Sequence, residues 1–221
     1  MDKAFAHDEA ILQAREILRG KYLVLDTETT GLDAPEACQL AYVTNDGIEF
    51  NVFVKPTVPI LPTATAIHGI TNEQVADANT IDMYWFAIGP HMLGRTLIGY
   101  NLQYDLGALQ TSFRRHNIDF EHRDRDKFDV MYAYAAYHGE IHSSQGTFKW
   151  QKLADALQQC GLTVEGQVHD ALVDAKATLQ LVRYMADQYT TWEVALRTAC
   201  DIIDFEPSFN EQVAKVTYRK L

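Results

Sequence analysis

The chain has 221 residues, of which 47% are hydrophobic and 22% charged, so it is long and apolar enough to bury a core. Its 30 acidic and 19 basic residues give a formal charge of −11, which excludes proteins that coat nucleic acid through a broad basic surface. Three widely spaced cysteines, Cys38, Cys160 and Cys200, argue against a disulfide framework and a structural zinc site. No apolar run approaches the roughly 20 residues of a membrane span, and charges interrupt the N-terminal stretch. We therefore expect a cytoplasmic protein with no membrane partner.

The first part of the chain predicts a helix followed by a meander of three strands. Apolar residues at helical spacing indicate a helix over residues 4–19. The next run is apolar on both alternating faces, as expected of a central strand covered on both sides. Asn45-Asp46-Gly47, between two further β-type runs, is typical of a hairpin. The three strands, which should be mutually antiparallel, are expected at 22–28, 38–44 and 48–54.

The remainder predicts a short strand among several helices. Prolines 56, 59 and 62 break regular structure before a loop at 68–70. A buried strand at 96–100 and a helix at 104–116 then form a β-then-α unit. Further helices are expected at 80–93, 128–138, 150–160, 170–189 and 190–203. Three meandering strands followed by strand and helix alternation indicate a mixed α/β sheet.

Two carboxylates end the first buried strand. Asp26 and Glu28 are two residues apart, so both side chains emerge on one face, with α-carbons roughly 6.6 Å apart. That separation suits ligands that share a metal ion. The alternative is a pair of solvated acids at a strand end. Asp105, after the 96–100 strand, could likewise join such a site or simply complement the dipole of its helix.

A third group of polar residues surrounds the start of the predicted 170–189 helix. Asp170 is well placed to be an ordinary N-cap. Asp174 lies inside the helix beside an apolar stripe, where an ion needs a partner. His169 does not share the helical face of Asp174, so it can reach the same site only from the preceding loop.

Taken together, these residues resemble the ordered motifs of the DEDDh 3′-to-5′ exonucleases of the DnaQ-like, proofreading epsilon-like family. The motifs lie at 26–31, 101–105 and 169–175, and residues 65–71 are similar to a loop that many proofreading-type members carry. Tyr104 stands where many members have phenylalanine. The resemblance covers about residues 21–187.

The resemblance implies a ribonuclease-H-like fold, with a mixed five-stranded sheet flanked by helices and the motifs converging at one end. It also implies two Mg²⁺ or Mn²⁺ ions held by carboxylates. Asp26 would bridge the ions, Glu28 and Asp174 would complete the site of the first, and Asp105 would support the second directly or through water. Histidine titrates near neutral pH, so His169 would take a proton from the attacking water. The product would be a nucleoside 5′-monophosphate.

The same resemblance implies a pocket for the terminal nucleotide. Its residues would be Thr29, Thr30, Gly31 and Leu32, with His68 and Ile70 bounding the pocket and Asn101 nearby. Leu32 and Ile70 could equally be core residues, and Asn101 could serve only to stabilise a turn.

The expected function is hydrolysis of single-stranded nucleic acid from its 3′ end. DNA is favoured over RNA because residues 29–31 resemble proofreading members. The alternatives are an exoribonuclease of the same fold and a non-catalytic nucleic-acid or protein-interaction module, which should have lost the carboxylates. We expect an N-terminal helix at 1–20, an exonuclease domain at 21–189 and a helical extension at 190–221. That extension would pack on the domain, on a DNA polymerase or on a second copy of the chain.

Overall fold

The computed structural model describes residues 2–120, 126–143, 146–167 and 169–202. Contacts within the chain define two units, Met1–Gln188 and Tyr189–Leu221. The second contains helix α9 (Thr191–Ile202), and residues 203–221 of the expected extension lie outside the described residues. What that extension packs on stays a prediction. In the described part of the chain, no helix combines the length and the apolar character needed to cross a bilayer.

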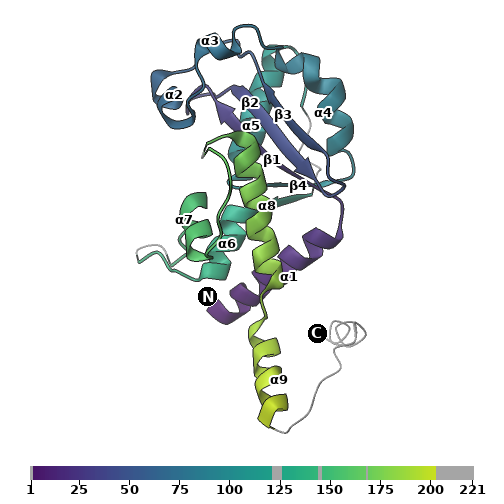
Figure 1. Cartoon of the computed structure of the whole chain (residues 1–221), viewed down its shortest axis with the longest axis vertical. Coiled ribbons are helices and arrows are strands. Elements are labelled where there is room, and N and C mark those ends of the chain that lie inside the picture. The colour runs from purple at the N-terminus through teal and green to yellow at the C-terminus, as the bar shows by residue number, and fades with distance from the viewer. Residues whose placement is uncertain (1, 121–125, 144–145, 168, 203–221) are drawn as a thin grey trace. The chain divides into compact units, whose positions relative to one another are not determined.

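The described residues form one mixed five-stranded sheet in the order β3-β2-β1-β4-β5 (Figure 1). β1 lies at its centre, antiparallel to β2 and parallel to β4. β2 and β3 form the expected antiparallel hairpin, and β5 is parallel to β4. The strands are β1 (Tyr22–Thr29), β2 (Ala37–Thr44), β3 (Glu49–Phe53), β4 (Thr96–Gly99) and β5 (Lys127–Asp129). The predicted fold class is confirmed.

Helices cover both faces of this sheet (Figure 1). In the first unit they are α1 (Lys3–Arg19), α2 (Pro62–His68), α3 (Asn72–Val75), the 3-10 turn η1 (Ile81–Tyr84), α4 (Trp85–Met92), α5 (Leu102–Arg115), α6 (Val130–His138), α7 (Leu153–Gln159) and α8 (Ala171–Asp187). Leu23 and Leu25 of β1 pack in one core layer with α4 and α5. Tyr22 and Val24 pack in the other with α1, α6 and α8.

The alternation of side chains along β1 decides where its polar residues point. Successive residues of a strand face opposite sides of the sheet. Asp26 and Glu28 therefore share the α8 side with Val24, whereas Thr27 shares the α5 side with Leu25. The side chains of the two acids and of the threonine between them therefore lie on opposite faces of the sheet.

Local prediction was wrong at two places. Residues 127–129 form the edge strand β5 instead of beginning a helix, because three residues are too few for any periodicity to appear. Pro62, expected to break structure, instead opens α2. Proline is favoured in the first turn of a helix because its missing N–H would have no partner there.

Candidate active site

β1 carries two acids to the edge of the core. Glu28 is buried and Asp26 is partly exposed. The pairing of β1 with β2 is regular through Glu28, which lies opposite Gln39, and the register then shifts between Glu28 and Thr29. This irregularity ends the strand directly after the acids, so the chain turns away beside them.

Helix α5 supplies Asp105 from its first turn. Its side chain is buried, with the residue only 3% exposed. Both the backbone N–H and the Oγ1 hydroxyl of Thr27 donate to Asp105 Oδ1, at 3.0 and 2.7 Å. Oδ2 takes no part in either bond. Thr27 therefore fixes the carboxylate from the α5 side and directs its other oxygen elsewhere.

The start of α8 supplies the remaining groups. Asp170 caps the helix, as expected, because its Oδ1 accepts from the N–H groups of Leu172 and Val173. His169, with a left-handed φ of 64°, lies just before the cap, and Asp174 lies one turn into the helix. His169 Nδ1 is 3.9 Å from Asp174 Oδ2.

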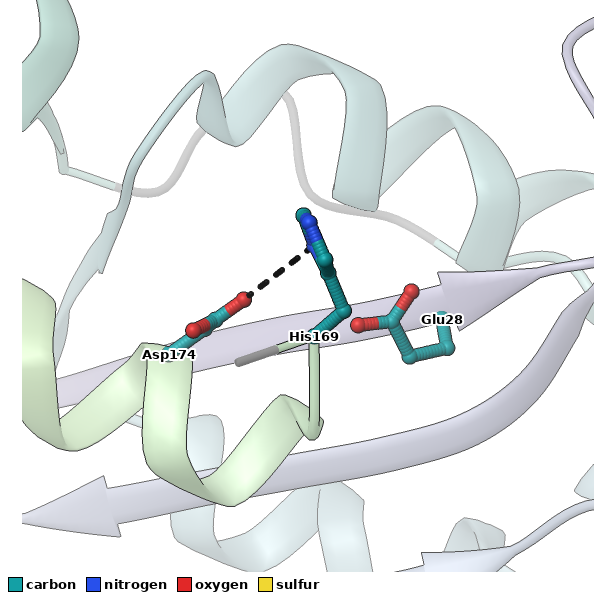
Figure 2. A group of neighbouring side chains, drawn as sticks. All are labelled: Glu28, His169 and Asp174. Carbon is teal, nitrogen blue, oxygen red and sulfur yellow. Dashed lines mark ion pairs between the residues drawn. The ribbon is translucent and has the colours of Figure 1, made fainter. Parts of the chain in front are cut away.

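Three of these side chains meet between the sheet and α8. Figure 2 shows Glu28 from β1 and Asp174 from α8 on either side of His169. Each offers one potential ligand atom, and these atoms all lie within 4.8 Å of one another. Among the described residues, this is the group of acids and histidine that is compact enough to hold a metal ion.

Burial raises the pKa of all four carboxylates, and repulsion within the group adds to the rise for Asp26 and Glu28. Burial, followed by repulsion from Asp174 and Asp105, raises the pKa of Glu28 to about 8. Burial raises the pKa of Asp105 to about 7, although the bonds from Thr27 oppose the rise. The pKa of Asp26 lies well above its ordinary value, first through burial and then through Asp105 and Asp174. Burial also raises the pKa of Asp174, against the attraction of His169.

Within the described residues, no lysine or arginine forms an ion pair with Asp26, Glu28, Asp105 or Asp174. The site thus gathers four carboxyl groups, and the basic side chain beside them is His169, 3.9 Å from Asp174. Carboxylate oxygens are the ligands that hard divalent cations prefer. These side chains suit such a cation both because they can carry negative charge and because they offer oxygen ligands.

The turn after β1 lies beside these acids and is held from three directions. The Tyr104 hydroxyl lies 2.8 Å from the carbonyl of Gly31, to which it donates, and 2.7 Å from Thr29 Oγ1. The N–H of Leu61 donates to the carbonyl of Thr30 at 3.0 Å. Thr30 Oγ1 itself accepts from the N–H of Glu36 at 3.1 Å. The turn is therefore fixed while its next residue stays open to solvent: Leu32 is 87% exposed.

His68 and Ile70 support this turn through hydrogen bonds that lead to the carbonyl of Thr29. The N–H of Ile70 donates to His68 Nδ1 at 3.0 Å, which assigns the ring proton to Nε2, and Nε2 bonds to the carbonyl of Thr29 at 3.1 Å. Ile70 is only 4% exposed and packs in a small core cluster with Ile60 and Val75. The structure therefore places the Ile70 side chain in the core, the alternative that the sequence left open.

Asn101 lies immediately before α5, the helix that carries Asp105. Its φ of 65° is left-handed, a conformation that asparagine tolerates better than most residues. Its N–H donates to Asp129 Oδ1 at 3.0 Å, and its side chain does not cap the helix. These contacts match the turn-stabilising alternative, and the residue itself is exposed.

Sequence reasoning gave no role to Thr27 or Gln39. The signal for Thr27 was its position between two acids on a strand, which sends it to the opposite layer. The signal for Gln39 was a glutamine in a strand whose every residue is buried. A buried amide needs hydrogen-bond partners, but the identity of those partners depends on contacts far along the chain.

Known proteins share this arrangement of elements. The family model RNase_T, described as exonuclease, matches residues 23–182. Uncharacterized exonuclease CP81 of Escherichia phage 186 is 34% identical over 180 residues, which cover 79% of this chain and 92% of that protein. RNA exonuclease 4 of Gibberella zeae is 28% identical over 169 residues, which cover 74% of this chain and 49% of that protein.

Among solved structures, E. coli exonuclease I in complex with a dA16 oligonucleotide matches with a TM-score of 0.64 at 20% identity. The match covers 81% of this chain and 43% of that one. The chain therefore spans most of the phage protein but less than half of the fungal and E. coli proteins.

Proposed function

This chain belongs to the RNase T exonuclease family and is a nuclease, and we propose that it is a metal-dependent 3′-to-5′ exonuclease acting on single-stranded DNA ends. The observation that carries the proposal is the meeting of Glu28, His169 and Asp174, with Asp26 and Asp105 close enough to interact electrostatically with the Glu28 carboxyl. The products are nucleoside 5′-monophosphates.

The carboxylates are proposed to hold two Mg²⁺ or Mn²⁺ ions. Asp26 would be a ligand shared by the ions, and Glu28 and Asp174 would complete the site of one of them. Asp105 would support the other directly or through water, with the oxygen that Thr27 does not engage. When bound, such a pair of ions stabilises the charge on the attacking and leaving oxygens of a phosphodiester.

His169 is proposed as the general base. It lies in a turn outside the helix with its side chain half exposed, so water and substrate can reach the ring. Asp174, 3.9 Å from Nδ1, favours one orientation of that ring. A histidine held in this way can accept the proton of the attacking water at neutral pH.

The turn after β1 is proposed to receive the terminal nucleotide. Leu32 projects into solvent next to the acids, where an apolar side chain can pack against a base. The bonds from Tyr104 to the Gly31 carbonyl and from Leu61 to the Thr30 carbonyl hold the backbone of the turn that precedes it. We assign Thr29, Thr30, Gly31 and His68 to this pocket, where their hydrogen bonds also support the turn.

DNA is the proposed substrate because residues 29–31 resemble those of proofreading nucleases. The fungal relative is named RNA exonuclease 4, which favours RNA as the second candidate. A non-catalytic module is disfavoured, because such a module has no use for buried carboxylates that raise one another's pKa.

The experiment compares matched single-stranded DNA and RNA oligonucleotides labelled at either end. With Mg²⁺, a 5′ label should give a descending ladder, while a 3′ label should appear at once as a mononucleotide, and EDTA should stop both. Asp26→Asn should abolish the ladder. Asp33→Asn removes an exposed acid from the neighbouring turn and is the matched control, which should keep wild-type turnover. Faster turnover of RNA than of DNA would transfer the proposal to the second candidate.

A further inference from the structure

β2 contains one buried amide that faces the candidate site. Gln39 is 3% exposed and lies directly opposite Glu28 in the register of β1 and β2. Paired residues of neighbouring strands point to the same side of a sheet. The Gln39 side chain therefore projects to the α8 side, beside the Glu28 carboxylate.

This amide connects the sheet to the first turn of α8 through both of its ends. Gln39 Nε2 donates to Asp170 Oδ2 at 2.9 Å and to Asn51 Oδ1 at 3.0 Å. Gln39 Oε1 accepts from the N–H of Ala171 at 3.2 Å. Asp170 and Ala171 lie 131 and 132 residues after Gln39 in the sequence, so these bonds connect distant segments of the chain.

The two residues that Gln39 holds lie between the functional groups of α8. Asp170 follows His169 directly, and its carbonyl accepts the N–H of Asp174 at 2.9 Å. Asp170 uses Oδ1 to cap the helix and Oδ2 to bind Gln39, so one side chain joins cap and sheet. A displacement of this turn would therefore shift His169 and Asp174 together relative to Glu28.

We propose that Gln39 is a positioning residue that sets the distance between the two halves of the site, Glu28 on the sheet and His169 with Asp174 on α8. The proposal rests on the function proposed above. An amide is suited to the task because it donates and accepts at once. An apolar residue would leave Asp170 Oδ2 and the Ala171 N–H without this partner, and a carboxylate would repel Asp170 and Glu28.

The hydrogen-bond pattern allows an inversion test. Gln39→Glu keeps an acceptor for the Ala171 N–H but places a carboxylate against Asp170. Adding Asp170→Asn replaces that repulsion by an amide donor, and asparagine caps a helix about as well as aspartate. Gln39→Glu should lower kcat by about 10- to 100-fold, the usual effect of losing a group that orients a ligand. The double variant should recover part of this loss when it is compared with Asp170→Asn alone, because the repulsion from Asp170 is removed while that from Glu28 remains.

Two further variants remove ambiguity. Gln158→Glu adds the same charge at an exposed position on α7 and should keep wild-type turnover. Gln39→Met removes all three bonds without adding charge and should also lower kcat, which keeps the test valid if Gln39→Glu fails to fold. Wild-type kcat in Gln39→Met, or absence of recovery in the folded double variant, would overturn the proposal.

Amide hydrogen exchange in the first turn of α8 gives a readout that does not depend on catalysis. Exchange over residues 171–174 should be faster in Gln39→Glu and Gln39→Met and should return towards the wild-type rate in the double variant. Unchanged exchange in both single variants would refute the connection itself. If the wild-type protein degrades neither DNA nor RNA, the proposed function fails, while the exchange result still decides whether Gln39 holds α8.

Discussion

Replacing Glu28 by glutamine should stabilise the protein in the absence of metal. The substitution keeps the size of the side chain and removes an ionisable group that lies among Asp26, Asp105 and Asp174. Burial, followed by repulsion from Asp174, Asp105 and Asp170, raises the pKa of Glu28 from 4.5 to about 8. A raised pKa means that the folded state resists ionisation more than the unfolded chain does, so folding carries a cost wherever the unfolded chain is ionised.

The size of this cost follows from the pKa. At pH 7 it accumulates between the ordinary value of 4.5 and pH 7, at about 1.36 kcal/mol per pH unit, which gives an upper bound of about 3.4 kcal/mol. Asp26 and Asp105 remain in place and still repel each other, so the substitution removes only part of the free-energy cost that the buried acids add to folding. We expect Glu28→Gln to gain about 1–3 kcal/mol, which corresponds to a rise of about 2–10 °C in Tm for a chain of this size.

The gain should depend on pH with a definite sign. Below pH 4.5 the carboxyl is protonated in both folded and unfolded states, so wild type and Glu28→Gln should be equally stable. Between pH 4.5 and about 8 the unfolded wild type loses its proton while the folded protein retains it, so wild-type stability falls relative to the variant. The difference should level off above pH 8.

Thermal unfolding in EDTA, followed at several pH values, measures this difference, and the scan is then repeated in Mg²⁺. Ligand present at about 100 times its Kd stabilises a folded protein by about 2.7 kcal/mol. Mg²⁺ should stabilise the wild type by this amount and Glu28→Gln by much less. The stability advantage of the variant should therefore shrink or change sign. Asp33→Asn is the control and should follow wild type throughout. A Glu28→Gln protein that is less stable than wild type in EDTA at pH 7 would refute the reasoning.

Three other substitutions separate the proposed roles. Asp26→Ala should abolish Mg²⁺-dependent turnover without lowering the metal-free Tm; near-wild-type turnover would remove Asp26 from the site. His169→Ala should slow hydrolysis by about 10² to 10⁴, with Mn²⁺ affinity by calorimetry nearly unchanged, and a rate loss under threefold would contradict its assignment as base. Tyr104→Phe loses the bonds to Gly31 and Thr29, so it should raise KM for DNA several-fold more than it lowers kcat; an unchanged KM would show that the turn is rigid without it.

Much of the architecture could be predicted because its signals are local. The family resemblance, the nuclease class and the mixed sheet are confirmed, and each depends on short motifs or on periodicity within one element. The positions of Asp26 and Glu28 on one side of β1 follow from strand alternation alone. Asp170 at the cap of α8 follows from helix-start chemistry. None of these inferences required knowledge of which elements touch.

The remaining features depend on contacts between distant segments. β5 is a strand because β4 pairs with it, and its three residues carry no pattern of their own. From the sequence, Ile70 could either bound a pocket or enter a core. Its packing against Ile60 and Val75 in the structure places it in a core. The partners of Gln39 lie 131 and 132 residues away along the sequence. Sequence reasoning could identify the polar residue in a buried strand, but only the fold identifies what it binds.

The register of β1 connects these contacts to the chemistry. Val24 and its partner Val43 pack on the α8 side, and Leu25 and its partner Tyr42 pack on the α5 side. A slip of one residue would exchange the two sides for every side chain of the strand. Apolar residues occupy both sides over 22–25, so core packing alone would tolerate that exchange better than the site would. Thr27 would then leave Asp105, and both acids would turn away from α8. The bonds from Thr27 to Asp105 thus favour, among the registers that the apolar residues permit, the one that the proposed site needs.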